Sequence, residues 1–122
     1  MMKPIPTTIA TLCLTSWALL SPVHAADADQ GLARVTELAQ VNGQALACQD
    51  MDTVAKAKKL MLAHAPKTPR FGSAFEETTN ASYLAQVRGT VPCPDAAHFA
   101  SKLDTLAKQL QAELPAIPTG TQ

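Results

Sequence analysis

The stretch from Val91 to Leu114 constrains the fold most, because it combines the clearest helical pattern with one of the cysteines. Its apolar residues recur at steps of three and four, so they share one side of a helix, while charged residues fall elsewhere. These apolar residues are Ala96, Phe99, Leu103, Leu106 and Leu110. Asp95 can cap the start with its carboxylate, and Pro115 disfavours continuation past Leu114. The pattern therefore predicts an amphipathic helix that begins next to Cys93 and packs one face against a core.

Residues 1–25 have the pattern of a secretory signal peptide. Lys3 supplies the positive charge, Ile9 to Leu20 form a short apolar run, and small residues around Ala25 suit cleavage. The run is too short to cross a bilayer as a helix, so no stable membrane insertion is expected after cleavage. We therefore expect a periplasmic or secreted protein, cleaved after Ala25, with a single helical domain over residues 26–114 and a flexible tail over residues 115–122.

Loss of the signal segment removes Cys13 and leaves Cys48 and Cys93 as a pair. An even pair in an oxidising compartment favours a disulfide, whereas a redox or metal role lacks a C-x-x-C spacing and a surrounding ligand cluster. In the loop-entropy model, closing the loop of residues 49–92 stabilises the fold by roughly 4 kcal/mol. We expect a structural bond between Cys48 and Cys93 that ties the end of one helix to the start of another.

A second helical pattern runs through residues 31–48. Positions on one side recur at helical steps: Leu32, Val35, Leu38 or Ala39, Asn42 and Leu46. Asp27 or Asp29 can cap its start. Asn42-Gly43 also has the composition of a turn, so the helix either continues to Cys48 or breaks at Gly43. Continuity is favoured, because residues 44–47 are compatible with a helix and a small residue lets another backbone approach.

Two more segments complete the expected fold. Asp52 to His64 is rich in good helix formers and is ended by Pro66 and Pro69, which leaves residues 67–72 as a loop. Ser73 to Val87 is expected to be a helix, with Ser73 and Glu76 as a capping box. Because no strand pattern competes, the fold class is predicted to be all-α: a small helical bundle of about four helices with one disulfide.

Charge and motif content narrow the function classes. Basic and acidic residues number ten each, so charge gives no argument for a nucleic acid or an anionic membrane as partner. The sequence contains no nucleophile elbow, metalloprotease helix motif or glycine-rich phosphate loop. Glu76 and Glu77 are adjacent, so on a helix they point in different directions and suit a solvated face. The sequence favours a protein that is not an enzyme and needs no cofactor.

The segment from His64 to Gly72 is the best candidate for binding a macromolecule. Its prolines stiffen the chain, and Lys67, Arg70 and Phe71 offer two cations and an aromatic ring together, a combination that interfaces favour. The alternative is a plain connection between helices with Phe71 in the core. The first interpretation predicts a protein that acts by protein–protein contact, as an inhibitor, a chaperone or an accessory subunit.

Met61 and His64 form the best candidate metal site, because they lie one helical turn apart and a thioether with an imidazole suits copper(I). Met51 or His98 are candidates for a further ligand. A periplasmic copper-binding protein is therefore the alternative function. The competing interpretation places Met61 in the core and His64 at its boundary.

In its format, the chain resembles the small periplasmic acid-stress chaperones and the periplasmic immunity proteins that block secreted toxins. The shared features are a signal peptide, a short helical domain and two cysteines. The resemblance implies an exported helical protein that contacts other proteins, and it assigns no role to an individual residue.

Overall fold

A computed structural model describes residues 2–4 and 23–116, and the described part contains four helices and no strand. The helices are α1 (Val23–Ala47), α2 (Met51–His64), α3 (Pro69–Arg88) and α4 (Ala96–Glu113). The predicted all-α bundle with one disulfide is therefore confirmed. Most of the predicted signal peptide and of the predicted tail lies outside the described residues. None of the four described helices has the length and apolarity needed to cross a membrane.

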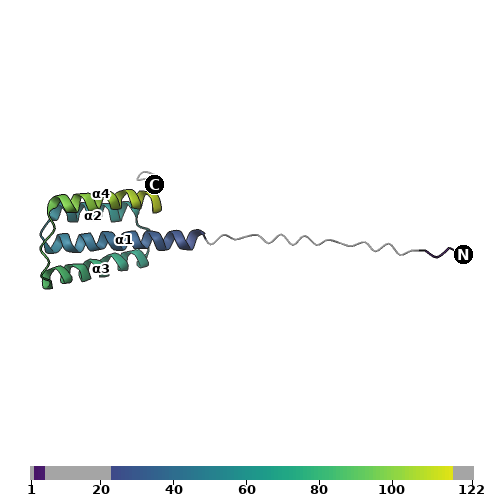
Figure 1. The fold of residues 1–122 in the computed structure, drawn as a ribbon, viewed down its shortest axis with the longest axis horizontal. Coiled ribbons are helices and arrows are strands. Elements are labelled where there is room, and N and C mark those ends of the chain that lie inside the picture. Colours follow the sequence, from purple (N-terminus) through teal and green to yellow (C-terminus); the bar gives the residue numbers. More distant parts are fainter. Residues whose placement is uncertain (1, 5–22, 117–122) are drawn as a thin grey trace.

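The helices are arranged around α1, which lies between α3 on one side and the pair α2 and α4 on the other (Figure 1). Within the described part, α1, α2 and α4 pack on one another, whereas the backbone of α3 comes close to that of α1 alone. The apolar core follows this arrangement. Its largest fully buried apolar side chains come from α1, α2 and α4: Val35, Leu38, Val54, Phe99, Leu106 and Leu110. In α3, Phe71 is the one residue counted as buried.

The last helix forms much as its sequence pattern predicts. Phe99, Leu103, Leu106 and Leu110 are all buried, and Ala96 differs because it lies in the exposed first turn. The Asp95 carboxylate accepts a hydrogen bond from the His98 backbone N–H at 2.7 Å, which satisfies one of the unpaired donors at the helix start. Sequence periodicity thus defines the buried face of α4, and the Asp95 cap defines its start.

Gly43 explains how α3 comes to lie against α1. The first helix runs through it without a break, as predicted, although it begins at Val23, so neither Asp27 nor Asp29 is its cap. A Cβ atom on Gly43 would lie 2.3 Å from the Thr79 carbonyl oxygen of α3. Contacts of this kind require glycine, because any side chain would force the two backbones apart. Nearby, the Ser82 hydroxyl donates to the Gln40 carbonyl at 2.8 Å, so the contact between α1 and α3 is close and partly polar.

Replacing Gly43 with alanine is expected to lower the free energy of unfolding despite the better helix propensity of alanine. Alanine gains about 1 kcal/mol in a helix interior, but overpacking against a backbone typically costs about 1–3 kcal/mol. Urea denaturation measures the difference. Gly72→Ala is the matched control, because a Cβ at Gly72 meets nothing within 4 Å. That control should be neutral or slightly stabilising; a Gly43→Ala protein as stable as the control would contradict the close contact.

The start of α3 corrects two predictions. Residues 69–72 were expected to be loop, with a capping box at Ser73 and Glu76, but α3 begins at Pro69 with Thr68 as its N-cap. Proline is well suited to the first helical position, where its missing N–H would have no partner in any case. Because Pro69 starts a helix instead of ending one, Ser73 lies inside α3 and cannot cap it.

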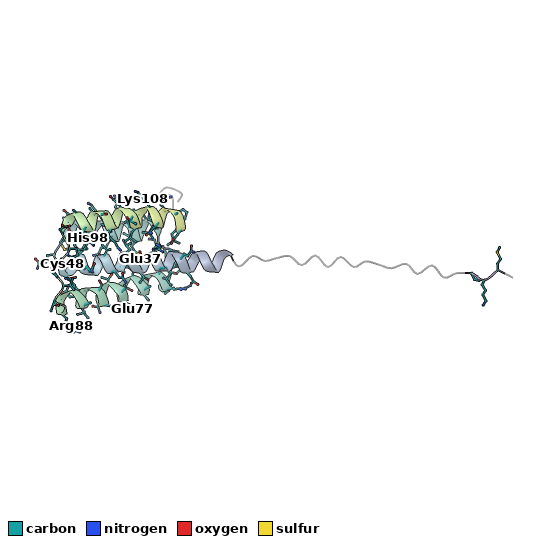
Figure 2. The ribbon with its side chains drawn as sticks, in the orientation of Figure 1. Glu37, Cys48, Glu77, Arg88, His98 and Lys108 are labelled. Carbon is teal, nitrogen blue, oxygen red and sulfur yellow. A yellow bond between two sulfur atoms is a disulfide. The ribbon has the colours of Figure 1, made fainter. Side chains whose placement is uncertain are left out.

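The disulfide joins Cys48, directly after α1, to Cys93, shortly before α4, with the two Cα atoms 5.7 Å apart. Figure 2 shows Cys48 at the end of the bundle that also holds Arg88, the last residue of α3. The predicted pairing is confirmed. It fixes the segment that leaves α3 to the end of α1, so the entry to α4 is held at that end of the bundle.

Candidate functional site

The three residues of the predicted binding segment do not lie together on an exposed loop. Phe71 is 5% exposed and belongs to the core. The Arg70 guanidinium donates to the Asp29 carboxylate at 2.7 Å, an exposed ion pair of a kind that contributes little to stability. The Lys67 ammonium donates to the Leu62 carbonyl at 2.8 Å. The segment therefore presents two cations at its surface, and its aromatic ring helps to dock α3.

The two residues of the predicted metal site have separate environments. Met61 is half-buried against the core, whereas His64 is buried at the end of α2. Nδ1 of His64 lies 2.7 Å from the Leu114 carbonyl oxygen, and because a carbonyl can only accept, this nitrogen carries the proton. Within the described residues no group of three or more His, Cys, Asp or Glu side chains is placed to hold a metal ion.

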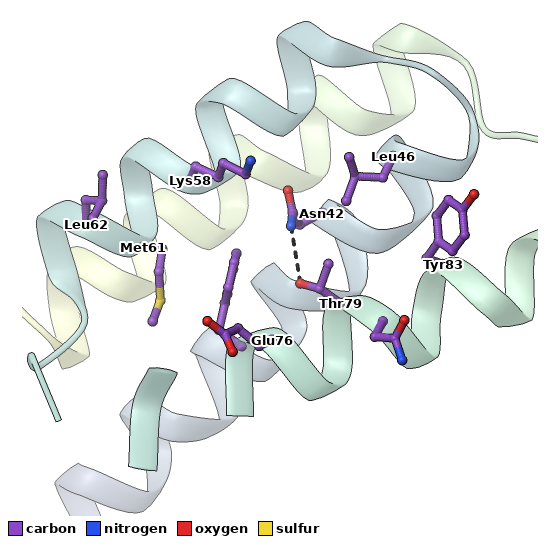
Figure 3. Close-up of a pocket in the computed structure, with 10 residues that line it drawn as sticks. Asn42, Leu46, Lys58, Met61, Leu62, Glu76, Thr79 and Tyr83 are labelled. Carbon is purple, nitrogen blue, oxygen red and sulfur yellow. Dashed lines mark hydrogen bonds between the residues drawn. The ribbon is translucent and has the colours of Figure 1, made fainter. Parts of the chain in front are cut away.

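A groove lies between α2 and α3 in the described part, with α1 as its floor (Figure 3). It exists because α2 and α3 both pack on α1 and leave space between them. Its volume is about 530 Å³, within the range of sites that hold small molecules or anchoring side chains. We call it the α2–α3 groove. It is lined by Asn42, Leu46, Lys58, Met61, Leu62, Phe75, Glu76, Thr79, Asn80 and Tyr83.

The walls of the α2–α3 groove are apolar and its edges carry opposite charges. Leu62 on α2 is 68% exposed and Tyr83 on α3 is 39% exposed, so both present apolar area at the groove. Lys58 stands on the α2 side and Glu76 on the α3 side, and both are exposed. An apolar centre with charged groups at its edges is the usual composition of a protein-binding surface.

The floor of the groove carries a polar group that is not satisfied. Asn42 is 1% exposed, and its Nδ2 donates to the Thr79 hydroxyl at 3.2 Å. The Oδ1 atom of Asn42 has no hydrogen-bond partner among the described residues. A buried acceptor without a donor costs roughly 1–3 kcal/mol, so such groups are rare in folded proteins. Among the residues that line the groove, Asn42 therefore carries the one buried polar atom without a hydrogen-bond partner.

Sequence reasoning identified one part of this site and missed the rest. The helical steps placed Asn42 on the same side of the first helix as its apolar residues, and Asn42 is buried. No local pattern linked Thr79 to Asn42. The groove depends on where α3 lies relative to α2, which helical periodicity does not describe. The one available sequence signal for the position of α3 was Asn42 next to Gly43, because both residues contact Thr79.

The fold and the groove define a small, disulfide-linked all-α protein with an open, mainly apolar groove. Compared with known proteins, the chain matches no protein-family model, no curated protein and no solved structure.

Proposed function

We propose that this chain is an exported, non-enzymatic protein that acts by contact with another protein, as an inhibitor, a chaperone or an accessory subunit. The observation that carries the proposal is the α2–α3 groove, with its exposed Leu62 and Tyr83. A concave surface lined by apolar side chains, with polar groups at its edges, has the composition of a binding site. The partner segment that suits the groove is an apolar one flanked by charges opposite to those of Lys58 and Glu76.

The groove supports this proposal better than the segment from His64 to Gly72. Binding energy at protein interfaces is concentrated in a few large side chains that become fully buried in the complex. Phe71 is already buried within the bundle, whereas Leu62 keeps 68% and Tyr83 keeps 39% of its area exposed and available for contact. We therefore propose the α2–α3 groove as the contact surface, with Lys67 in the connection before α3 and Arg70 in the first turn of α3 outside its lining.

The test is a capture experiment with the tagged full-length protein in its native exported fraction. The double variant Leu62→Glu/Tyr83→Glu should lose the captured partner at least tenfold, because two buried charges would oppose docking. Val91→Glu is the matched control, because Val91 is 71% exposed and does not line the groove. That control should capture as the wild type does.

Two outcomes of the capture experiment would contradict the proposal in different ways. If Lys67→Ala/Arg70→Ala abolishes capture while the groove variant does not, the contact surface is the His64–Gly72 segment. If no protein is captured by the wild type, and none of these variants has a phenotype, the proposed contact function is wrong. Circular dichroism of each variant shows whether the helical fold is retained.

The alternative of a copper-binding protein rests on the thioether of Met61 and the imidazole of His64. Met61 lines the groove, and His64 has one ring nitrogen engaged with the Leu114 carbonyl. This alternative predicts one copper(I) site that is lost when Met61→Leu and His64→Asn are combined. Equilibrium titration with copper(I) decides it. Wild-type stoichiometry below detection would remove this function from consideration.

A further inference from the structure

The α2–α3 groove carries opposite charges on its two sides, Lys58 on α2 and Glu76 on α3 (Figure 3). Both side chains are exposed, and among the described residues neither of them forms an ion pair. Protein interfaces are arranged so that a cation on one surface meets an anion on the other. A surface that offers one of each is able to be complementary to a copy of itself.

Lys58 and Glu76 also lie at matching levels of the bundle. The short connection of residues 65–68 joins α2 to α3, so the two helices run in opposite directions, and residues equally far from the connection lie at the same level. Lys58 and Glu76 are nearly equally far from it. The same holds for Met51, which is 59% exposed, and Tyr83, which is 39% exposed. Helical steps place each of these two on the same side of its helix as the charged residue.

A two-fold axis that runs along the groove brings the matching positions of two copies together. Half a turn about this axis lays α3 of the second copy over α2, and α2 of the second copy over α3, without changing the level of any residue. Lys58 then meets Glu76 of the second copy, and the reverse pair forms by symmetry. Met51 meets Tyr83 of the second copy in the same way. The two surfaces therefore match both in charge and in apolar area.

Three further features favour this arrangement. Leu62 is 68% exposed, and the second copy offers it the α3 wall that Phe75 lines. The sequence holds ten basic and ten acidic residues, so no net charge opposes the approach of two copies. An axis across the groove, by contrast, sets α2 on α2 and α3 on α3, which leaves Lys58 and Glu76 without partners of opposite charge.

We propose that a second copy of this chain covers the α2–α3 groove in a two-fold symmetric dimer, in which Lys58 of each copy pairs with Glu76 of the other. The inference rests on the proposed function in using the groove as a contact surface, and it adds that the second copy and the protein partner exclude each other there. Exposed ion pairs contribute little to affinity, so the apolar contacts of Leu62 and Tyr83 hold the dimer, and the ion pairs fix its register.

The test measures self-association of the protein purified from its exported fraction, by sedimentation equilibrium over a range of concentrations. The wild type should be a monomer–dimer mixture whose dimer fraction rises with concentration. Lys58→Glu and Glu76→Lys should each weaken the dimer about tenfold, because symmetry turns two attractive pairs into two repulsive ones. Lys59→Glu and Glu77→Lys are the matched controls. They make the same charge changes at exposed positions outside the groove lining and should leave the dissociation constant unchanged.

Exchange of the two charges tests the geometry of the dimer. An equimolar mixture of the Lys58→Glu and Glu76→Lys proteins should associate as the wild type does, because both pairs are attractive again in the mixed dimer. The double variant Lys58→Glu/Glu76→Lys should also regain the wild-type dissociation constant. A dimer that joins α2 to α2 gives neither the loss in the single variants nor this recovery.

The inference is overturned if the wild type stays monomeric up to millimolar concentration, or if it forms a dimer on which the single variants act no more than their controls. The proposed function is then still decided by the capture experiment with Leu62→Glu/Tyr83→Glu. A dimer that responds to Lys58 and Glu76 as expected, in a chain that captures no other protein, would support the inference and contradict the proposed function. The two ideas therefore fail separately.

Discussion

Replacing Cys48 and Cys93 together with serine is expected to lower the free energy of unfolding by about 4 kcal/mol, within the typical range of about 2–5 kcal/mol for small exported domains. The bond closes a loop with a sequence separation of 45, so its loss restores much of the disorder of the unfolded chain. For a domain of this size the loss is comparable with the whole net stability. Denaturant titration of the wild type and the double variant measures it.

The control for the disulfide prediction is the wild-type protein under reducing conditions, which should resemble the serine variant. Where the variant still folds, it should keep the capture activity, because neither cysteine lines the α2–α3 groove. Non-reducing mass spectrometry of protein taken from its native compartment tests the bond itself. Two free thiols in that material would contradict a structural role and would give the redox and metal interpretations new weight.

Replacing Phe99 with alanine is expected to cost about 3–5 kcal/mol, the usual range for deleting a buried aromatic ring. Phe99 is 1% exposed and is the largest of the fully buried side chains in the described part, so its removal leaves a cavity that α1, α2 and α4 share. Thermal denaturation in parallel with Val91→Ala provides the comparison, because Val91 is exposed and its truncation should have an effect within about 0.5 kcal/mol. Equal melting temperatures for the two variants would mean that α4 does not dock as described.

The sequence predicted those parts of the fold that depend on local chemistry. The periodicity of α4, the cap at Asp95 and the pairing of Cys48 with Cys93 each follow from residues close in sequence or from counting cysteines, and each is confirmed. The predicted start of α3, at Ser73, was wrong for a physical reason. A proline ends one helix and can also begin the next, and the choice depends on whether Phe71 finds a place in the core.

The candidate site could not be predicted, because it results from the spacing between two helices whose backbones do not approach each other closely. Helical patterns describe which side of α2 or α3 is apolar, but they do not say that the backbone of α3 lies close to α1 alone. The lack of a side chain at Gly43 and the polar side chain of Asn42 next to it are the sequence features that specify this placement. Their meaning depends on Thr79, which lies one helix away in the fold and far away in the sequence.

The attachment of α3 has a consequence for how firmly this helix is held in the bundle. Both ends of α3 are held, by the short connection of residues 65–68 to α2 and by the segment that the disulfide fixes after Arg88. If α3 leaves α1, it stays at high effective concentration near its place, so reclosure is unimolecular and fast compared with refolding of the chain. Such an opening would separate α3 from α1, which is the most extensive helix contact of the described part, and would withdraw Phe71 from the core. The two tethers and this contact together favour the docked position of α3.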